Sequence, residues 1–199
     1  MDKPSGLKEL FDFYYQEFKP IYGELAASNE PSEEMLLEVN AAFDHLSRIW
    51  RYGDPEPETV HRVLGHLKRG CFDAYKIILR QATDHYKELK KTDTSIIDNG
   101  HFDQGMHALR AEIVRLSIEA RTCEGDARDE KNWHTAFDGW QKVYVLCKRF
   151  EKDFFLNKNV EWARKKNRRK SVIQYLAGVA TGVVSGILAR AIWDLFAKK

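Results

Sequence analysis

The feature that most constrains this chain is the stretch 172–189, in which 18 consecutive residues carry no charge. As a helix they extend about 27 Å, slightly less than the hydrocarbon core of a typical bilayer. Arg190 can snorkel outward, which lengthens the usable span through Ile192 or Trp193. Tyr175 and Trp193 stand near the two ends, so both interfaces have an amphipathic ring. The alternative is a buried helix of a soluble bundle, but the stretch is apolar on every side and lacks an amphipathic stripe. The pattern therefore predicts one transmembrane helix.

A run of basic residues directly precedes this stretch and divides the chain into three parts. Its six positive charges are Arg164, Lys165, Lys166, Arg168, Arg169 and Lys170. The last 29 residues add a net +2, so the first 163 must carry −6 to give the chain total of +2. We therefore expect an acidic body (1–163), a basic juxtamembrane segment (164–170) and a transmembrane helix with a short tail (171–199).

The basic run predicts both an orientation and a partner. Lys and Arg concentrate on the cytoplasmic side of a span, and only Lys198 and Lys199 follow the span when it is extended past Arg190. Basic residues beside a span also attract anionic lipid, by about 1 kcal/mol each. Nucleic-acid binding is the alternative, although an acidic body disfavours a broad nucleic-acid surface. The first ten residues lack an apolar signal-peptide region. We thus expect a tail-anchored, single-pass protein of the inner (cytoplasmic) membrane with a cytoplasmic N-terminal domain.

Three glycines within the apolar stretch recur at intervals of four: Gly178, Gly182 and Gly186. Small residues repeat the same spacing beside them, at Ala177, Thr181, Ser185 and Ala189. A helix face without side-chain bulk lets backbones approach closely in lipid, so we expect copies of the chain to form a homo-oligomer through this face. A Gly-rich anchor without a partner is the alternative. The residues polar enough to line a pore are Gln174, Thr181 and Ser185.

Before residue 164, apolar residues recur at steps of three and four, which is the period of amphipathic helices. The stripes fall at about 7–25, 36–50, 58–90, 106–120 and 133–154. We expect Pro20 to kink the first helix and residues 92–104 to form the longest loop. The second stripe is expected to face the core and consists of Leu36, Val39, Phe43, Leu46 and Trp50. The sequence shows no alternating strand pattern, so the predicted fold class is all-α: a bundle of about five helices followed by the transmembrane helix.

The sequence predicts neither a metal nor a cofactor. Three cysteines are far apart and fit buried helix positions: Cys71, Cys123 and Cys147. His61 and His66 diverge on one helix, so they make a poor metal site with His45. Four polar residues share one helix face: His66, Arg69, Asp73 and Lys76. We expect this face to be solvated or to form ion pairs with a neighbouring helix, with a polar seam that receives a ligand as the alternative.

Two Arg/His pairs carry the enzymatic hypothesis. Arg80 and His85 form R-x4-H, and Arg128 and His134 form R-x5-H. In an all-helical chain, this spacing resembles the R-x4–6-H motif of the HEPN superfamily, all-helical nucleotide-binding domains frequent in bacterial antiviral and toxin systems. The resemblance implies metal-independent RNA cleavage by a dimer, in which histidine acts as acid or base and arginine stabilises phosphate charge. Asp129 after Arg128 is closer to the family's preferred polar residue, which favours the second pair, whereas His85 also fits a core histidine.

Three functions are compatible with these features. We favour a non-enzymatic, membrane-anchored and self-associating bacterial effector of the defence or toxin type, whose Gly-rich helices oligomerise and form a pore or perturb the membrane. A membrane-tethered HEPN-like ribonuclease is the alternative from another class, and a tail-anchored adaptor is the third. The expected partners are the lipid bilayer, further copies of the chain, and a defence-system protein or RNA.

Overall fold

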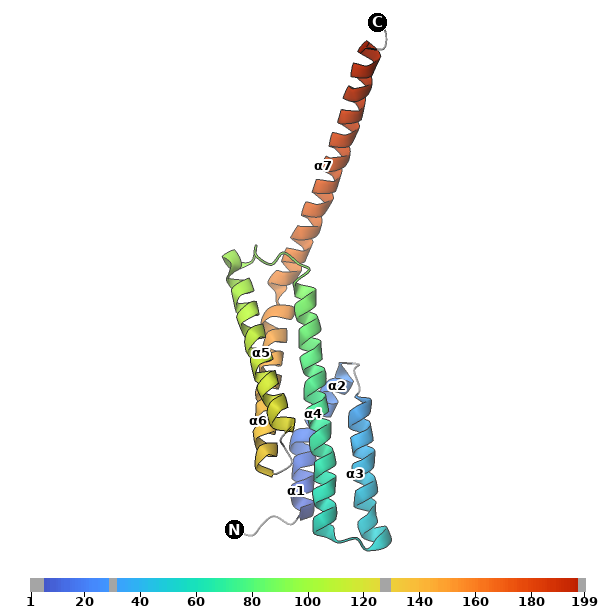
Figure 1. Cartoon of the computed structure of the whole chain (residues 1–199), viewed down its shortest axis with the longest axis vertical. Helices are drawn as coiled ribbons and strands as arrows, with labels where there is room; N and C mark the ends of the chain where they lie inside the picture. The colour runs from blue at the N-terminus through green and yellow to red at the C-terminus, as the bar shows by residue number, and fades with distance from the viewer. Residues whose placement is uncertain (1–5, 29–31, 126–129, 197–199) are drawn as a thin grey trace.

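The computed structural model describes residues 6–28, 32–125 and 130–196, and every regular element in these ranges is a helix. Five helices form a body and a sixth leaves it (Figure 1). The all-α fold class and the body of about five helices are confirmed.

The first body helix comprises α1 (Gly6–Phe13), the π-helical turn η1 (Tyr14–Phe18) and α2 (Lys19–Ala27), which follow one another without a break. The others are α3 (Glu33–Tyr52), α4 (Glu56–Leu89), α5 (His101–Gly125) and α6 (Glu130–Phe150). A second π-helical turn, η3 (Glu151–Phe155), continues α6, and α7 spans Lys158–Phe196.

The first helix continues through Pro20, where we expected a kink. Proline has no N–H to donate, so a regular α-helix would leave one carbonyl without its partner. The helix widens to a π-helical turn just before this point, and the Lys19 N–H donates to the carbonyl of Tyr14, five residues earlier. The turn therefore carries the helix past the proline.

The ends of α3 and the start of α5 follow from local chemistry. The Ser32 hydroxyl accepts a hydrogen bond from the Met35 N–H at 3.0 Å and caps α3. Gly53 ends the same helix in the left-handed region, at φ 72°. A second left-handed turn, with Asn99 at φ 50° and Gly100 at φ 87°, starts α5 at His101. The loop predicted to run to residue 104 is therefore shorter than expected.

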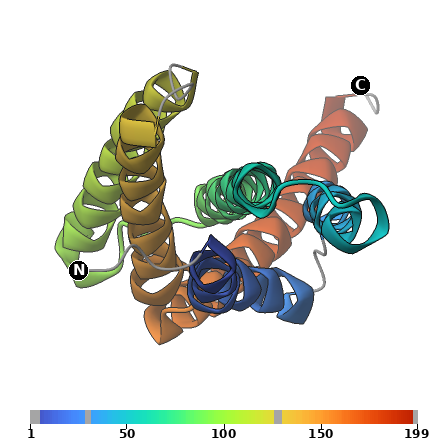
Figure 2. The ribbon, with the colours of Figure 1, turned by 90° about the horizontal axis from the view of Figure 1, so that it is seen from below.

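The central helix of the body is α4. It packs against α3 on one side and α6 on another, and α1, η1 and α2 also lie against it. The fourth body helix, α5, packs mainly on α6 and contacts α4 through polar pairs such as Lys76 with Glu124. Seen along the body, α5 and α6 lie on one side of α4 and α3 on the other (Figure 2).

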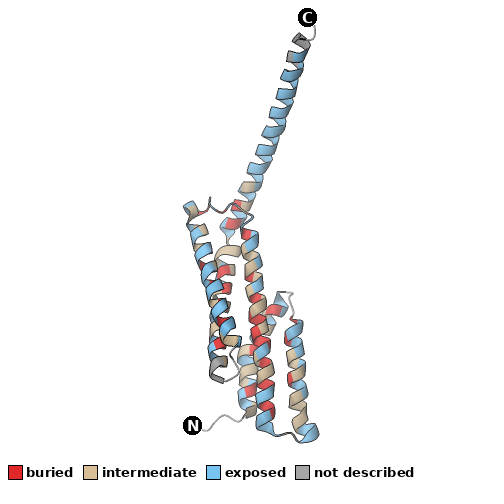
Figure 3. Ribbon diagram, in the orientation of Figure 1, coloured by how far each residue is buried: buried red, intermediate tan, exposed pale blue. Residues whose placement is uncertain are grey.

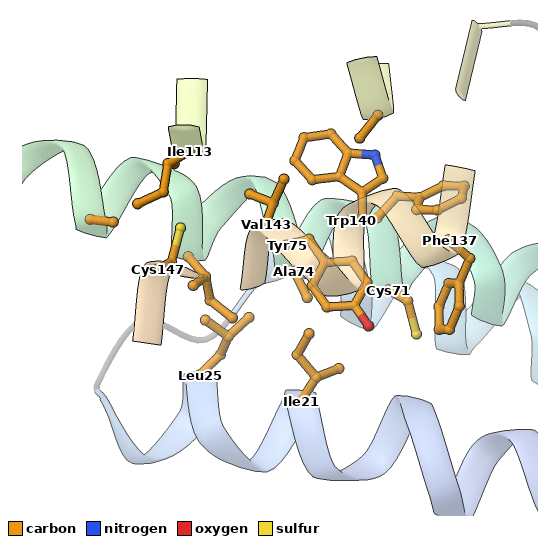
Figure 4. Close-up of a cluster of buried hydrophobic side chains, with 14 of the residues drawn as sticks. Ile21, Leu25, Cys71, Ala74, Tyr75, Ile113, Phe137, Trp140, Val143 and Cys147 are labelled. Carbon is orange, nitrogen blue, oxygen red and sulfur yellow. The ribbon is translucent and has the colours of Figure 1, made fainter. Parts of the chain in front are cut away.

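The core lies where α2, α4, α5 and α6 meet (Figure 4). Trp140, Phe150 and Ile113 are 0% exposed. Full burial of a large apolar side chain contributes about 1.5–3 kcal/mol, so this cluster holds the body together. The indole N–H of Trp140 donates to Glu124 at 3.1 Å, which satisfies its polar atom. The stripes predicted for α4, α5 and α6 supply most of this core, as expected.

Two of the three cysteines occupy the core positions predicted for them. Cys71 is 0% exposed and Cys147 is 2% exposed. Burial raises the pKa of both thiols, that of Cys147 to about 12, so both remain protonated at neutral pH. Cys123 is only half-buried, which differs from the prediction.

The stripe predicted to bury α3 is wrong for its outer half. Leu36, Phe43 and Trp50 are 43%, 72% and 69% exposed. The fully buried positions of α3 are Met35 and Ala42. Val39 and Leu46 of the predicted stripe are partly buried and pack against the core, as expected. Among the described residues no helix covers the outer side of α3, so its stripe forms one wall of an open apolar groove of about 340 Å³ against α1 and α4.

Candidate membrane anchor

The base of α7 is embedded in the body. The side-chain oxygen of Asn157 accepts a hydrogen bond from the Asn159 N–H at 2.9 Å, which caps the helix. In the next turns Val160 and Ala163 are 1% and 0% exposed. One continuous helix thus holds both core residues and the apolar stretch, and it leaves the body without a linker (Figure 1).

Two contacts hold α7 at the point where it leaves the body. The guanidinium of Arg164 lies 2.8 Å from the carboxylate of Glu88, in the last turn of α4. One turn later, the side-chain amide of Asn167 donates to the backbone carbonyl of Asp93 at 3.2 Å. Sequence reasoning missed both partners, because they are 76 and 74 residues away and no motif connects them.

The whole basic run, including Arg164, forms a collar around α7. We use the name basic collar for Arg164, Lys165, Lys166, Arg168, Arg169 and Lys170. All of them except the half-buried Arg164 are exposed. Seven consecutive helical residues cover two turns, so the collar presents positive charge in every direction around the helix. The ammonium of Lys166 also lies 4.9 Å from the ring of Trp162, which is half-exposed.

The apolar stretch beyond the collar is exposed along its whole length (Figure 3). An 18-residue window of this helix is long and apolar enough to cross a membrane, and none of that window is buried in the body. Ile173 is 66% exposed and Leu188 is 58% exposed. The alternative of a buried core helix is therefore wrong. One candidate membrane-spanning helix follows the all-α body.

The glycines of α7 are not explained by packing within the chain. A Cβ atom added at Gly178, Gly182 or Gly186 would meet nothing within 4 Å. By contrast, a Cβ at Gly70 of α4 would lie 2.7 Å from the ring of Phe18, and one at Gly139 of α6 would lie 3.2 Å from Ala120. Gly70 and Gly139 of the body thus serve close contacts, whereas the three glycines of α7 lie in open space.

The pair Arg80/His85 lies on α4. Arg80 is exposed, and the ring of His85 stacks on Phe155 with their centroids 3.6 Å apart. Among the described residues, Nδ1 of His85 has no hydrogen-bond partner. Burial lowers the pKa of His85, and the carboxylates of Glu151 and Glu88 oppose this shift. His85 therefore has the surroundings of a neutral, half-buried histidine.

The other pair cannot be placed as a pair, since Arg128 lies outside the described residues. His134 is exposed near the start of α6, and its ring lies 4.8 Å from that of Trp133. A catalytic role for either pair stays a prediction.

The polar face of α4 forms ion pairs with neighbouring helices. Nδ1 of His66 lies 2.6 Å from the Glu38 carboxylate of α3, and Arg69 donates to the same carboxylate at 3.2 Å. Farther along, Lys76 lies 2.6 Å from Glu124 of α5. Across the described ranges, no group of three or more His, Cys, Asp or Glu side chains is arranged to hold a metal ion.

No protein-family model matches this chain, and neither curated proteins nor solved structures match it. Its function must therefore be inferred from its own residues.

Proposed function

We propose that this protein is a membrane-anchored, self-associating effector of the bacterial defence or toxin type, with its helical body in the cytoplasm and α7 across the inner membrane. One observation carries the proposal. An apolar helix with a face of three glycines and a basic collar projects from a folded body with no part of its apolar window covered.

Insertion of α7 follows from its composition. Residues 172–189 contain eight Val, Ile and Leu side chains and no charge. Each such side chain near the middle of a span favours insertion by about 0.3–0.6 kcal/mol, so together they supply about 2–5 kcal/mol. The basic collar adds attraction to anionic headgroups and keeps its own side in the cytoplasm.

Self-association follows from the glycine face. In lipid, helices gain no hydrophobic free energy by pairing, so close backbone approach and dispersion decide which faces meet. Gly178, Gly182 and Gly186 give α7 such a face. Binding of a partner to the body would favour the arrangement in which these faces pack, and the assembled helices would then perturb the membrane. Gln174, Thr181 and Ser185 would line a pore if one opens.

Three chains test the proposal: the wild type, Gly182→Leu and His134→Ala. Each is expressed in a bacterial host and measured for resistance to carbonate extraction, for sedimentation in mild detergent and for entry of a membrane-impermeant dye into cells. We expect all three to resist extraction. Gly182→Leu is expected to sediment as a monomer and to stop dye entry, whereas His134→Ala behaves as the wild type.

Other outcomes point to other functions. Extraction of the wild type by carbonate would overturn the anchor. Absence of dye entry with the wild type would leave α7 as the membrane-targeting helix of an adaptor. Dye entry that survives Gly182→Leu would show that membrane perturbation does not need the glycine face. Loss of dye entry in His134→Ala, together with cleavage of cellular RNA by the wild type, would favour the ribonuclease.

A further inference from the structure

A cleft opens where α7 leaves the body, between the collar and the end of α4. Its volume is about 620 Å³, within the range of ligand sites. Glu88, Lys91 and Thr92 line it from the α4 side, and Arg164, Arg168 and Val172 line it from α7. The cleft thus joins two parts of the chain that are far apart in sequence.

The cleft has an excess of positive charge. Its carboxylate, Glu88, is already engaged by Arg164 at 2.8 Å. Within the described residues, no ion pair engages Lys91 or Arg168. The nearby Asp93 carboxylate accepts hydrogen bonds from the hydroxyl and N–H of Ser95 instead. Two cations therefore remain for an anionic ligand.

The position of the cleft matches the headgroup layer of a membrane. Val172 is the first residue of the uncharged stretch, and Arg168 precedes it by four residues, or about 6 Å of helix. The polar layer on each side of the hydrocarbon core is about 5–7 Å thick. A phosphate at Arg168 would thus lie at the depth of lipid phosphates, while Val172 faces the start of the acyl chains.

We propose that this cleft binds the phosphodiester headgroup of one anionic phospholipid, with Lys91 and Arg168 on the phosphate and the acyl chains along α7 from Val172. The proposal rests on the membrane insertion argued above. A lipid in this place bridges α4 and α7, so it fixes the angle between the body and the membrane. The sequence predicts diffuse attraction along the collar, whereas the cleft predicts one defined site that includes a residue outside the collar.

The test uses the full chain in mild detergent and counts bound phosphatidylglycerol by native mass spectrometry, with phosphatidylcholine and inorganic phosphate as competitors. The cleft variant is Lys91→Gln with Arg168→Gln. Its matched control is Lys165→Gln with Arg169→Gln, which removes the same two residue types from exposed positions outside the cleft. Thermal unfolding of each variant checks that the body remains folded.

We expect one tightly retained phosphatidylglycerol per wild-type chain and an affinity at least about tenfold lower in the cleft variant than in the control, which corresponds to about 1.4 kcal/mol. Equal losses in the two variants would overturn the site and leave only diffuse attraction. Displacement of the lipid by millimolar inorganic phosphate would overturn the lipid in favour of a free anion. Carbonate extraction of the wild type is a separate readout: failure there overturns the proposed function, whereas equal losses with an intact anchor overturn this inference alone.

Discussion

The two longest helices of this protein, α4 and α7, are similar in length and opposite in design. α4 has 34 residues, of which one stripe is buried and the opposite face carries charge. α7 has 39 residues, and beyond its embedded base it separates charge and apolar surface along its axis rather than around it. A helix patterned around its circumference folds against other helices in water, and a helix patterned along its axis suits a boundary between two solvents.

The glycines of α4 and α7 also differ in their packing. Gly70 of α4 is buried, and the ring of Phe18 packs so closely on it that a Cβ atom at this position would lie only 2.7 Å from the ring. Gly182 of α7 has open space around it. Packing within the chain therefore explains the glycine of α4, whereas the glycine of α7 has no packing neighbour in the chain.

The largest expected effect is that of removing residues 171–199, which separates the body from the apolar part of α7. The shortened chain keeps every buried residue of the body and loses the whole apolar window. We expect nearly all of it to move from the carbonate-resistant membrane fraction to the supernatant, with an unchanged helical circular-dichroism spectrum per body residue. Retention in the membrane fraction would show that the body itself binds lipid.

Two tryptophans, one in the core of the body and one in α7, should contribute very differently to the free energy of unfolding. Trp140 is 0% exposed in the core, whereas Trp193 of α7 is 72% exposed. Trp140→Ala is expected to lower the free energy of unfolding of the body by about 3–5 kcal/mol, because it leaves a cavity and removes one hydrogen bond from the Glu124 carboxylate. Trp193→Ala is expected to leave it unchanged. Denaturant unfolding followed by circular dichroism measures both, and equal effects would contradict the assigned core.

The glycines provide a smaller test. Gly70→Ala places a methyl group against the packed ring of Phe18, so we expect a loss of about 1–2 kcal/mol after the gain in helix propensity is included. Gly65→Ala, where the nearest atom is the end of the Arg69 side chain at 3.7 Å, is the matched control and should be neutral or stabilising. The measurement is thermal unfolding of the body; a neutral Gly70→Ala would mean that Phe18 can move.

The smallest expected effect concerns pH. Because burial lowers the pKa of His85, the unfolded state binds a proton more tightly than the folded state does. The free energy of unfolding is therefore expected to fall as pH decreases from about 6.5 towards the lower pKa of the folded protein. His85→Phe keeps a ring on Phe155 and should flatten this slope, whereas the exposed His134→Gln should not. Unfolding curves at a series of pH values decide between them.

Much of the body could be predicted from its sequence, because the stripes of α4, α5 and α6 repeat with the helical period and face the core. Periodicity identifies residues that share a face but not the surface that covers them, which is why Phe43 and Trp50 were wrongly expected in the core. Local patterns also do not show where a helix changes to π-helical turns, as at residues 14–18.

The candidate site was predictable in part. The apolar stretch, the glycines and the collar are contiguous in sequence, so composition alone revealed them. The cleft required the fold, since Lys91 and Arg168 meet only after α4 and α7 have been brought together.

The join between the body and α7 has a mechanical consequence. Two residues separate η3 from α7, and the helix then runs unbroken from buried Val160 to the apolar stretch. A rod clamped at one end transmits torque, so a change in the tilt of α7 would act directly on its contacts with Glu88 at the end of α4 and with Asp93.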